Sequence, residues 1–163
     1  MSVVLYRLAG VGLACVLVST AHAQLLSRKD LSAAMAVTMA QETIAVCKTN
    51  GYAVSVTVVG RNGEPLLQLR GDNTGPHTLE NSFKKAFTSR TFRIPSGEME
   101  ERLKKNPQMG AQYLTGFTTG RGALPIKVGE ETIGAIGASG APGGEKDEAC
   151  VQAGIAKVAD QLK

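Results

Sequence analysis

Arg70-Gly-Asp-Asn-Thr-Gly-Pro-His-Thr-Leu-Glu-Asn-Ser-Phe-Lys-Lys-Ala-Phe-Thr-Ser-Arg-Thr-Phe92 is the stretch that decides the predicted fold. It leads from the end of a strand, through a turn, into a helix predicted from Pro76 to Phe92. Leu79, Phe83 and Phe87 recur at helical spacing and give this helix an apolar face. The segments before and after this stretch are each predicted to form half of a small sheet. The central helix lies between the two halves, and we expect any functional site near its start.

Each flanking half of the chain combines one β-hairpin with helices. Upstream, Ser27 or Asp30 is predicted to cap a helix that ends at about Asn50, and an Asn62-Gly63 turn joins two strands. The predicted segments are, in order, helix 27–50, strands 52–59 and 66–70, helices 76–92 and 96–106, a glycine-rich stretch near residue 117 that suits either an irregular loop or an extra short strand, strands 125–128 and 132–138, and helix 145–162. The order α-β-β-α-α-β-β-α predicts an α+β domain in which helices flank an antiparallel sheet of about five strands.

The first 23 residues have the pattern of a secretory signal peptide. Arg7 supplies a positive start, Leu8 to Val18 form an apolar run, and Ala21-His22-Ala23 is a cleavage site. The apolar run is too short to cross a bilayer comfortably. We therefore predict that residues 1–23 are removed and that residues 24–163 form one domain, periplasmic or secreted, with no membrane span after cleavage.

The charge and the aromatic content argue against a nucleic-acid partner. Removing Arg7 leaves 17 of the 18 basic residues against 14 acidic ones, so the net charge falls from +4 to +3. That surplus is small for a DNA-binding surface. The chain has no Trp and only 4% aromatic residues, and stacking on single-stranded nucleic acid depends on aromatic faces.

Two cysteines, Cys47 and Cys150, remain after cleavage. In an oxidising compartment they can form a disulfide that closes a long loop. Two separate buried thiols are an equally good interpretation, because free cysteine packs as a small apolar residue. The sequence leaves this choice open.

The motifs of common enzymes are missing. The glycine-rich segment Gly134–Gly140 lacks the spacing of a nucleotide-binding loop, and Ala141 stands where a nucleophile elbow needs glycine. Its small residues instead favour close packing of a strand against a helix or a neighbouring subunit. A single histidine after cleavage excludes a two-histidine zinc site. No catalytic residues are predicted, and an enzyme is the less favoured class.

His77 is the candidate metal ligand. It lies in the first turn of the predicted central helix, where the helix dipole favours the neutral imidazole that ligates iron. Several other residues suit a haem group. The cations that could meet its propionates are Lys84, Lys85, Arg90 and Arg121. The aromatic rings that could pack on its macrocycle are those of Phe83, Phe87 and Phe92. A histidine on a solvated turn is the commoner use of a lone histidine, so the residues alone leave the site open.

The whole pattern resembles the GlcG/HbpS family of haem-binding and haem-degrading-related proteins, and is similar to the C-terminal domain of PduO-type adenosyltransferases. Five segments carry the resemblance, at residues 47–52, 54–63, 84–92, 133–140 and 147–154. It implies a sheet flanked by helices, non-covalent binding of haem or a related tetrapyrrole, and homo-oligomers. The chain departs from the family at Gly60-Arg61, where an Asp is common, and at Gly122-Ala-Leu-Pro125. The axial ligand varies in the family, so His77 is assigned from its chemistry and position.

The favoured function is therefore an exported haem-binding protein in haem or iron handling or in sensing. The alternative is an extracytoplasmic accessory or sensor module that acts through a protein partner without haem. An enzyme of haem breakdown is a third class.

Overall fold

The computed structural model describes residues 24–163, so the predicted signal peptide lies outside the described residues. The elements follow the predicted order: helix α1 (Ala33–Thr49), strands β1 (Ser55–Val59) and β2 (Pro65–Leu69), helices α2 (Thr78–Phe92) and α3 (Ser96–Lys105), the 3-10 turn η1 (Gly110–Tyr113), strands β3 (Ala123–Val128) and β4 (Glu131–Ser139), helix α4 (Gly144–Ala156) and the 3-10 turn η2 (Ala159–Gln161). The α+β class is confirmed. The sheet has four strands rather than about five, because the chain around Phe117 lies in a loop.

The boundaries of three helices differ from the prediction. The side chain of Ser32 caps α1, so the helix begins after both Ser27 and Asp30. His77 occupies the N-cap position of α2, just before the first helical residue, Thr78. The final predicted helix ends early at Ala156 and continues as the turn η2.

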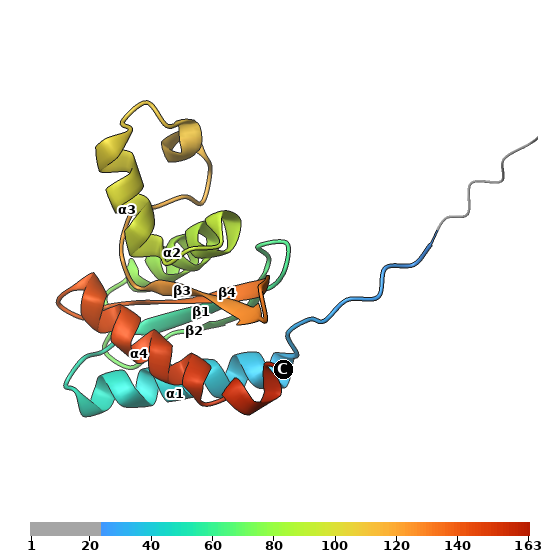
Figure 1. Ribbon diagram of the computed structural model, residues 1–163. Coiled ribbons are helices and arrows are strands. Elements are labelled where there is room, and N and C mark those ends of the chain that lie inside the picture. Colours follow the sequence, from blue (N-terminus) through green and yellow to red (C-terminus); the bar gives the residue numbers. More distant parts are fainter. Residues whose placement is uncertain (1–23) are drawn as a thin grey trace, which may run out of the picture.

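The four strands form one antiparallel sheet in the order β2-β1-β4-β3. The two hairpins therefore meet through their first and last strands, and β1 pairs with β4 from Ser55 opposite Ser139 to Val59 opposite Ala135. Helices cover both faces: α1 and α4 lie on one side, and α2 with α3 on the other (Figure 1). Every residue of β1 is buried as a result.

The two faces of β1 differ in chemistry. Val56 and Val58 belong to the main apolar core, together with residues of α1 and α4 such as Met39 and Val151. The alternate residues face α2. There the hydroxyl of Ser55 lies 2.8 Å from that of Thr78, and the hydroxyl of Thr57 lies 2.8 Å from that of Ser82. Hydrogen bonding satisfies these buried polar groups, which would otherwise destabilise the fold.

Small residues bring α2 close to the sheet, as the glycine-rich segment Gly134–Gly140 predicted. A Cβ atom on Gly137 of β4 would lie 2.6 Å from the carbonyl oxygen of Ser82 and 2.9 Å from the backbone nitrogen of Ala86. Glycine is therefore required where the strand crosses the backbone of α2. This close approach fixes α2 firmly, and with it the residues at its start.

On the opposite face, α1 packs directly against α4. A Cβ on Gly154 of α4 would lie 2.6 Å from the carbonyl oxygen of Met39 and would also meet the Thr43 hydroxyl. A disulfide between Cys47 and Cys150 joins the same two helices, with their Cα atoms 5.5 Å apart. The structure thus answers the question that the sequence left open about these cysteines.

In residues 24–163 the structure contains no helix that is long and apolar enough to span a membrane.

Candidate functional site

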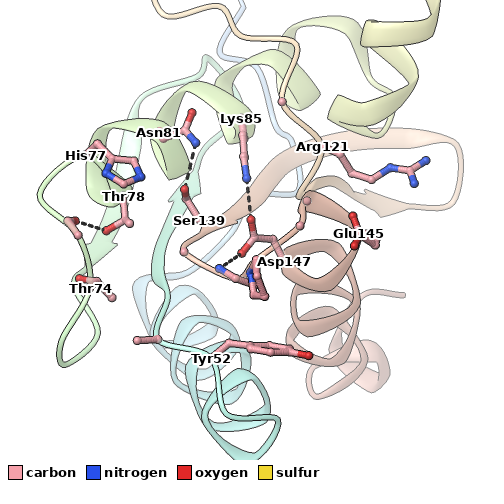
Figure 2. Close-up of a pocket in the computed structure, with 18 of the residues that line it drawn as sticks. Tyr52, Thr74, His77, Thr78, Asn81, Lys85, Arg121, Ser139, Glu145 and Asp147 are labelled. Carbon is pink, nitrogen blue, oxygen red and sulfur yellow. Dashed lines mark hydrogen bonds and ion pairs between the residues drawn. The ribbon is translucent and has the colours of Figure 1, made fainter.

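A cavity with a volume of about 950 Å³ opens beside the start of α2. We call it the His77 cavity. Its walls come from the segment between α1 and β1, the turn before α2, the first two turns of that helix, the first part of α3, the loop before β3, and the loop that joins β4 to α4. Figure 2 shows the lining side chains that matter for its chemistry: Tyr52, His77, Asn81, Lys85, Arg121, Ser139, Glu145 and Asp147. Gly75 and the carboxylates of Glu100 and Glu101 line it as well. The polar ends of strands and helices thus converge on one hollow.

The turn that carries His77 is held by backbone and side-chain hydrogen bonds. Arg70 donates from its guanidinium to the carbonyl oxygens of Gly75 and Pro76, at 3.1 and 3.2 Å. The Thr78 hydroxyl donates to the Gly75 carbonyl at 2.8 Å. Arg70 therefore has a structural role at the end of β2, and the turn places His77 in one position.

The His77 side chain itself is exposed and lines the cavity. Among residues 24–163, its imidazole has no side-chain hydrogen bond and does not cap the helix. It lies against Gly75, where a Cβ atom would come within 3.0 Å of Cε1 and 3.1 Å of Nδ1. Gly75 thus leaves space for a ring whose nitrogen atoms are free to bind a ligand.

Lys85 lies two turns after His77, on the same face of α2, and is almost fully buried. Its Nζ donates to Asp147 Oδ2 at 2.8 Å and to the Ala138 carbonyl at 3.0 Å. Side-chain exposure is 5% for Lys85 and 3% for Asp147. Burial raises the pKa of the Asp147 carboxyl, and the charge of Lys85 opposes that rise.

Asp147 also holds the loop that forms one wall of the cavity. Its Oδ1 accepts a hydrogen bond from the backbone nitrogen of Ala141 at 3.0 Å. Gly122 passes close by, and a Cβ there would lie 2.8 Å from Asp147 Cβ and 2.9 Å from Lys85 Nζ. The ion pair therefore links α2 to α4 and to the β4–α4 loop, and the loop before β3 packs closely against it.

The remaining wall is mostly polar. Asn81 Nδ2 donates to the Ser139 hydroxyl at 3.0 Å. Arg121 lies on the far side of the cavity from His77 in Figure 2, and its side chain is 51% exposed. Its nearest carboxylate, that of Glu148, is 3.7 Å from Nε, so Arg121 is only loosely paired. Tyr52 contributes the aromatic surface of the cavity.

The structure brings together only some of the residues predicted for the site. His77, Lys85 and Arg121 line one cavity. Lys84 instead forms an ion pair with Glu80 on the outer surface of α2, with an Nζ to Oε1 distance of 2.6 Å. Phe87 and Arg90 line a separate, smaller cleft. A helix displays its residues all round, and the sequence does not say which side faces a cavity.

Other lining residues were missed by the sequence analysis. Asn81 follows His77 by one helical turn and Lys85 follows by two, a spacing that already puts them on one face. In the sequence, Asp147 stands in the first turn of the final predicted helix, where an acidic residue is ordinarily explained by the helix dipole. Its pairing with Lys85 spans 62 residues of sequence, so no local pattern indicates it.

Comparison with known proteins identifies the class of protein. The model of one protein family, described as "Haem degrading protein HbpS-like", matches residues 31–156. The chain therefore belongs to the HbpS-like family. This confirms the resemblance seen in the sequence.

Within residues 24–163 there is no group of three or more His, Cys, Asp or Glu side chains placed to hold a metal ion. A search among curated proteins gave no match.

Solved structures give the more particular relationships. The crystal structure of HbpS is 32% identical, covers 85% of this chain and 97% of its own, and has a TM-score of 0.78. A double mutant of HbpS from Streptomyces reticuli is 31% identical, with coverage of 88% and 97% and a TM-score of 0.78. A complex of PduOC with haem is 19% identical, with coverage of 78% and 94% and a TM-score of 0.71, and shares the fold.

Proposed function

We propose that this protein binds haem or a related tetrapyrrole in the His77 cavity, with His77 as the iron ligand. One observation carries the proposal: an exposed imidazole without a hydrogen-bonding partner in residues 24–163 stands at a cavity of about 950 Å³. Imidazole is the commonest metal ligand and a frequent axial ligand of haem. Membership of the HbpS-like family supports the same ligand.

The residues of the cavity fit such a group. Small-molecule sites measure roughly 300–1,000 Å³, and this cavity lies at the upper end of that range. Lys85 is already neutralised by Asp147, which leaves Arg121 as the lining cation that can receive a propionate carboxylate. Tyr52 supplies an aromatic surface for the macrocycle. Lys84, Phe87 and Arg90 lie outside this cavity and have no part in the proposed site.

Bound haem would supply an iron centre for redox chemistry or for signalling by occupancy. The protein's own part is to hold it. His77 ligates, Arg121 binds a carboxylate, and the Lys85–Asp147 ion pair fixes the loop and helix that carry the site.

The proposal includes a location outside the cytoplasm and a role in haem or iron handling or in sensing. The Cys47–Cys150 disulfide supports this location, since such bonds persist in oxidising compartments. The predicted signal peptide points the same way. Assembly into a homo-oligomer is part of the same proposal, and sedimentation of the purified protein with and without hemin measures it.

Titration with hemin tests the proposed ligand. We expect a Soret band that saturates at a fixed stoichiometry. His77→Ala should shift the band and weaken binding at least tenfold, because the iron would lose its proposed protein ligand. A featureless titration of the wild-type protein would contradict haem binding and favour a sensor module that acts through a protein partner. Release of iron together with an open-chain product, after addition of a reductant in the presence of dioxygen, would instead reveal an enzyme of haem breakdown.

A pair of arginine variants tests the position of the propionates. Arg121→Gln should weaken hemin binding several-fold while leaving the wavelength of the Soret band unchanged. Arg102→Gln is the matched control, because Arg102 is exposed on α3, is paired with Glu98 and does not line the cavity. Equal effects of the two variants would show that overall charge, and not Arg121, governs affinity.

A further inference from the structure

A second, smaller cleft lies between the β1–β2 turn and α2 and is separate from the His77 cavity. Its volume is about 150 Å³, and its walls are Arg61, Asn62, Gly63, Phe87, Arg90 and Thr91. None of these residues lines the His77 cavity. The two arginines give this cleft a positive character.

The turn on one side of the cleft is firmly seated on α2. Gly63 has a left-handed backbone with φ 84°, and a Cβ there would lie 2.9 Å from Phe87 Cε2. Glu64 Oε2 accepts a hydrogen bond from the backbone nitrogen of Asn62 at 2.9 Å, and the Gly60 nitrogen donates to the Glu64 carbonyl at 2.8 Å. The carboxylate of Glu64 is thus engaged in holding the turn.

Arg61 is fixed by contacts at the two ends of its guanidinium. Nη1 donates to Glu131 and Nη2 to the Lys29 carbonyl, and the side chain is only 10% exposed. Its Nε is buried and has no hydrogen-bond partner in residues 24–163. The guanidinium of Arg61 is therefore held in one position beside the cleft.

Arg90 presents the same feature from α2. It is half-buried, its Nε is buried without a partner, and no carboxylate of residues 24–163 lies within ion-pair distance of it. Burial lowers the pKa of Arg90, and the charges of Arg93 and Arg61 lower it further, whereas Glu64 acts in the opposite direction. Arg61 already has Glu131 as its partner, so Arg90 is the cation of this cleft that lacks a carboxylate. The positive charges of Arg61 and Arg93 nearby give this part of the surface an excess of positive charge that an anion can neutralise.

We propose that Arg61 and Arg90 form a binding site for a small oxyanion of the phosphate or carboxylate class. Guanidinium groups bind such oxygens through charge-assisted hydrogen bonds. The volume of about 150 Å³ compares with about 30 Å³ for one water molecule in the liquid. Inorganic phosphate or a single carboxylate therefore fits, and haem or a nucleotide does not. The site does not depend on haem binding in the His77 cavity.

Nuclear magnetic resonance titration of the purified protein tests the site. Inorganic phosphate and acetate are added in separate series, with sodium chloride keeping the ionic strength constant. We expect saturable shifts of the backbone amides of Asn62, Gly63 and Thr91 with at least one of the two anions. Tighter binding of phosphate would indicate a site for a tetrahedral oxyanion, and tighter binding of acetate would indicate a site for a carboxylate.

Variants show whether Arg90 carries the binding. Arg90→Gln should weaken binding at least tenfold, and Arg90→Lys, which keeps the charge without the Nε donor, should also weaken it. Arg102→Gln removes the same charge elsewhere and should change the affinity less than twofold. Shifts that never saturate with either anion, or equal affinities of Arg90→Gln and the wild type, would overturn the proposal. Thermal unfolding of each variant confirms that it is folded under the titration conditions.

Discussion

Lys85 carries a positive charge into the interior between α2, β4 and α4, where Asp147 is its counter-ion. Lys85→Met keeps much of the volume but leaves the Asp147 carboxylate buried and unpaired. Removing one partner of a buried ion pair costs about 3–5 kcal/mol. We expect a loss of that size in the free energy of unfolding at pH 7, measured by urea denaturation.

The neighbouring lysine provides the control. Lys84 forms an ion pair with Glu80 at the surface, with exposures of 39% and 70%. Exposed pairs contribute about 0–1 kcal/mol, so Lys84→Met should change stability by less than about 1 kcal/mol. Similar losses in the free energy of unfolding in both variants would show that the buried ion pair contributes no more to stability than the exposed one.

The Lys85→Met variant should also respond to pH in a defined direction. Burial raises the pKa of Asp147, and loss of Lys85 removes the positive charge that opposes this rise. The folded variant then binds a proton more readily than the unfolded chain does. Its deficit in stability should be largest at neutral pH and shrink as the pH falls through the raised pKa of Asp147. Urea denaturation at pH 7 and pH 5 measures the change, and a deficit equal at both would contradict this origin.

At the scale of single residues, the sequence supported the candidate ligand but not its surroundings. A histidine just before an amphipathic helix is visible in the sequence, and the structure places His77 at the N-cap of α2, beside a cavity. Lys85 appeared equally suited to bind a propionate. Its actual partner, Asp147, comes from the last helix, and only the folded chain brings the two together.

The elements themselves were largely predictable because their local signals are strong. The strand β1 shows β-branched alternation, and Asn62-Gly63 marks the hairpin, with Gly63 in the left-handed region at φ 84°. Helix starts were less accurate. Ser27, Asp30 and Ser32 can all cap a helix, and only tertiary packing selects Ser32.

The crossing of α1 and α4 gives a prediction at the scale of elements. Gly154→Ala would place a methyl group against the Met39 carbonyl oxygen and the Thr43 hydroxyl. Overpacking of this kind typically costs about 1–3 kcal/mol, and because the contact is with a backbone, a side-chain rotation cannot relieve it fully. We expect a lower melting temperature by differential scanning calorimetry.

Gly110→Ala is the matched control, since a Cβ on Gly110 meets nothing within 4 Å. The substitution should leave the melting temperature nearly unchanged. If Gly154→Ala were equally neutral, the two helices would have enough freedom to move apart, and the close crossing would not limit stability.

For the whole molecule, the order of elements was predictable but their arrangement was not. Two hairpins with helices before, between and after them specify an α+β domain. The strand order β2-β1-β4-β3 depends on the pairing of β1 with β4, which are separated by the whole central part of the chain. The glycine-rich stretch near Phe117 suits a loop as well as a strand, and the structure has the loop, so the sheet has four strands and not about five.

The disulfide should contribute strongly to global stability. Cys47 and Cys150 are separated by 103 residues, and closing a loop of that size stabilises by roughly 4–5 kcal/mol through the entropy of the unfolded chain. A reductant should lower the midpoint of urea denaturation accordingly. The Cys47→Ala/Cys150→Ala variant should lose similar stability and no longer respond to the reductant. Identical masses after alkylation with and without prior reduction would show that the bond is absent.

The same bond gives the protein a covalent ring that runs from α1 to α4 and contains the whole sheet with α2 and α3. The exposed segment from Lys104 to Gln108, at the end of α3, lies within that ring. A protease that cuts there produces two fragments that remain attached to each other. In surroundings rich in proteases, one nick therefore neither releases a piece of the domain nor separates the His77 turn from the α4 loop that completes its cavity.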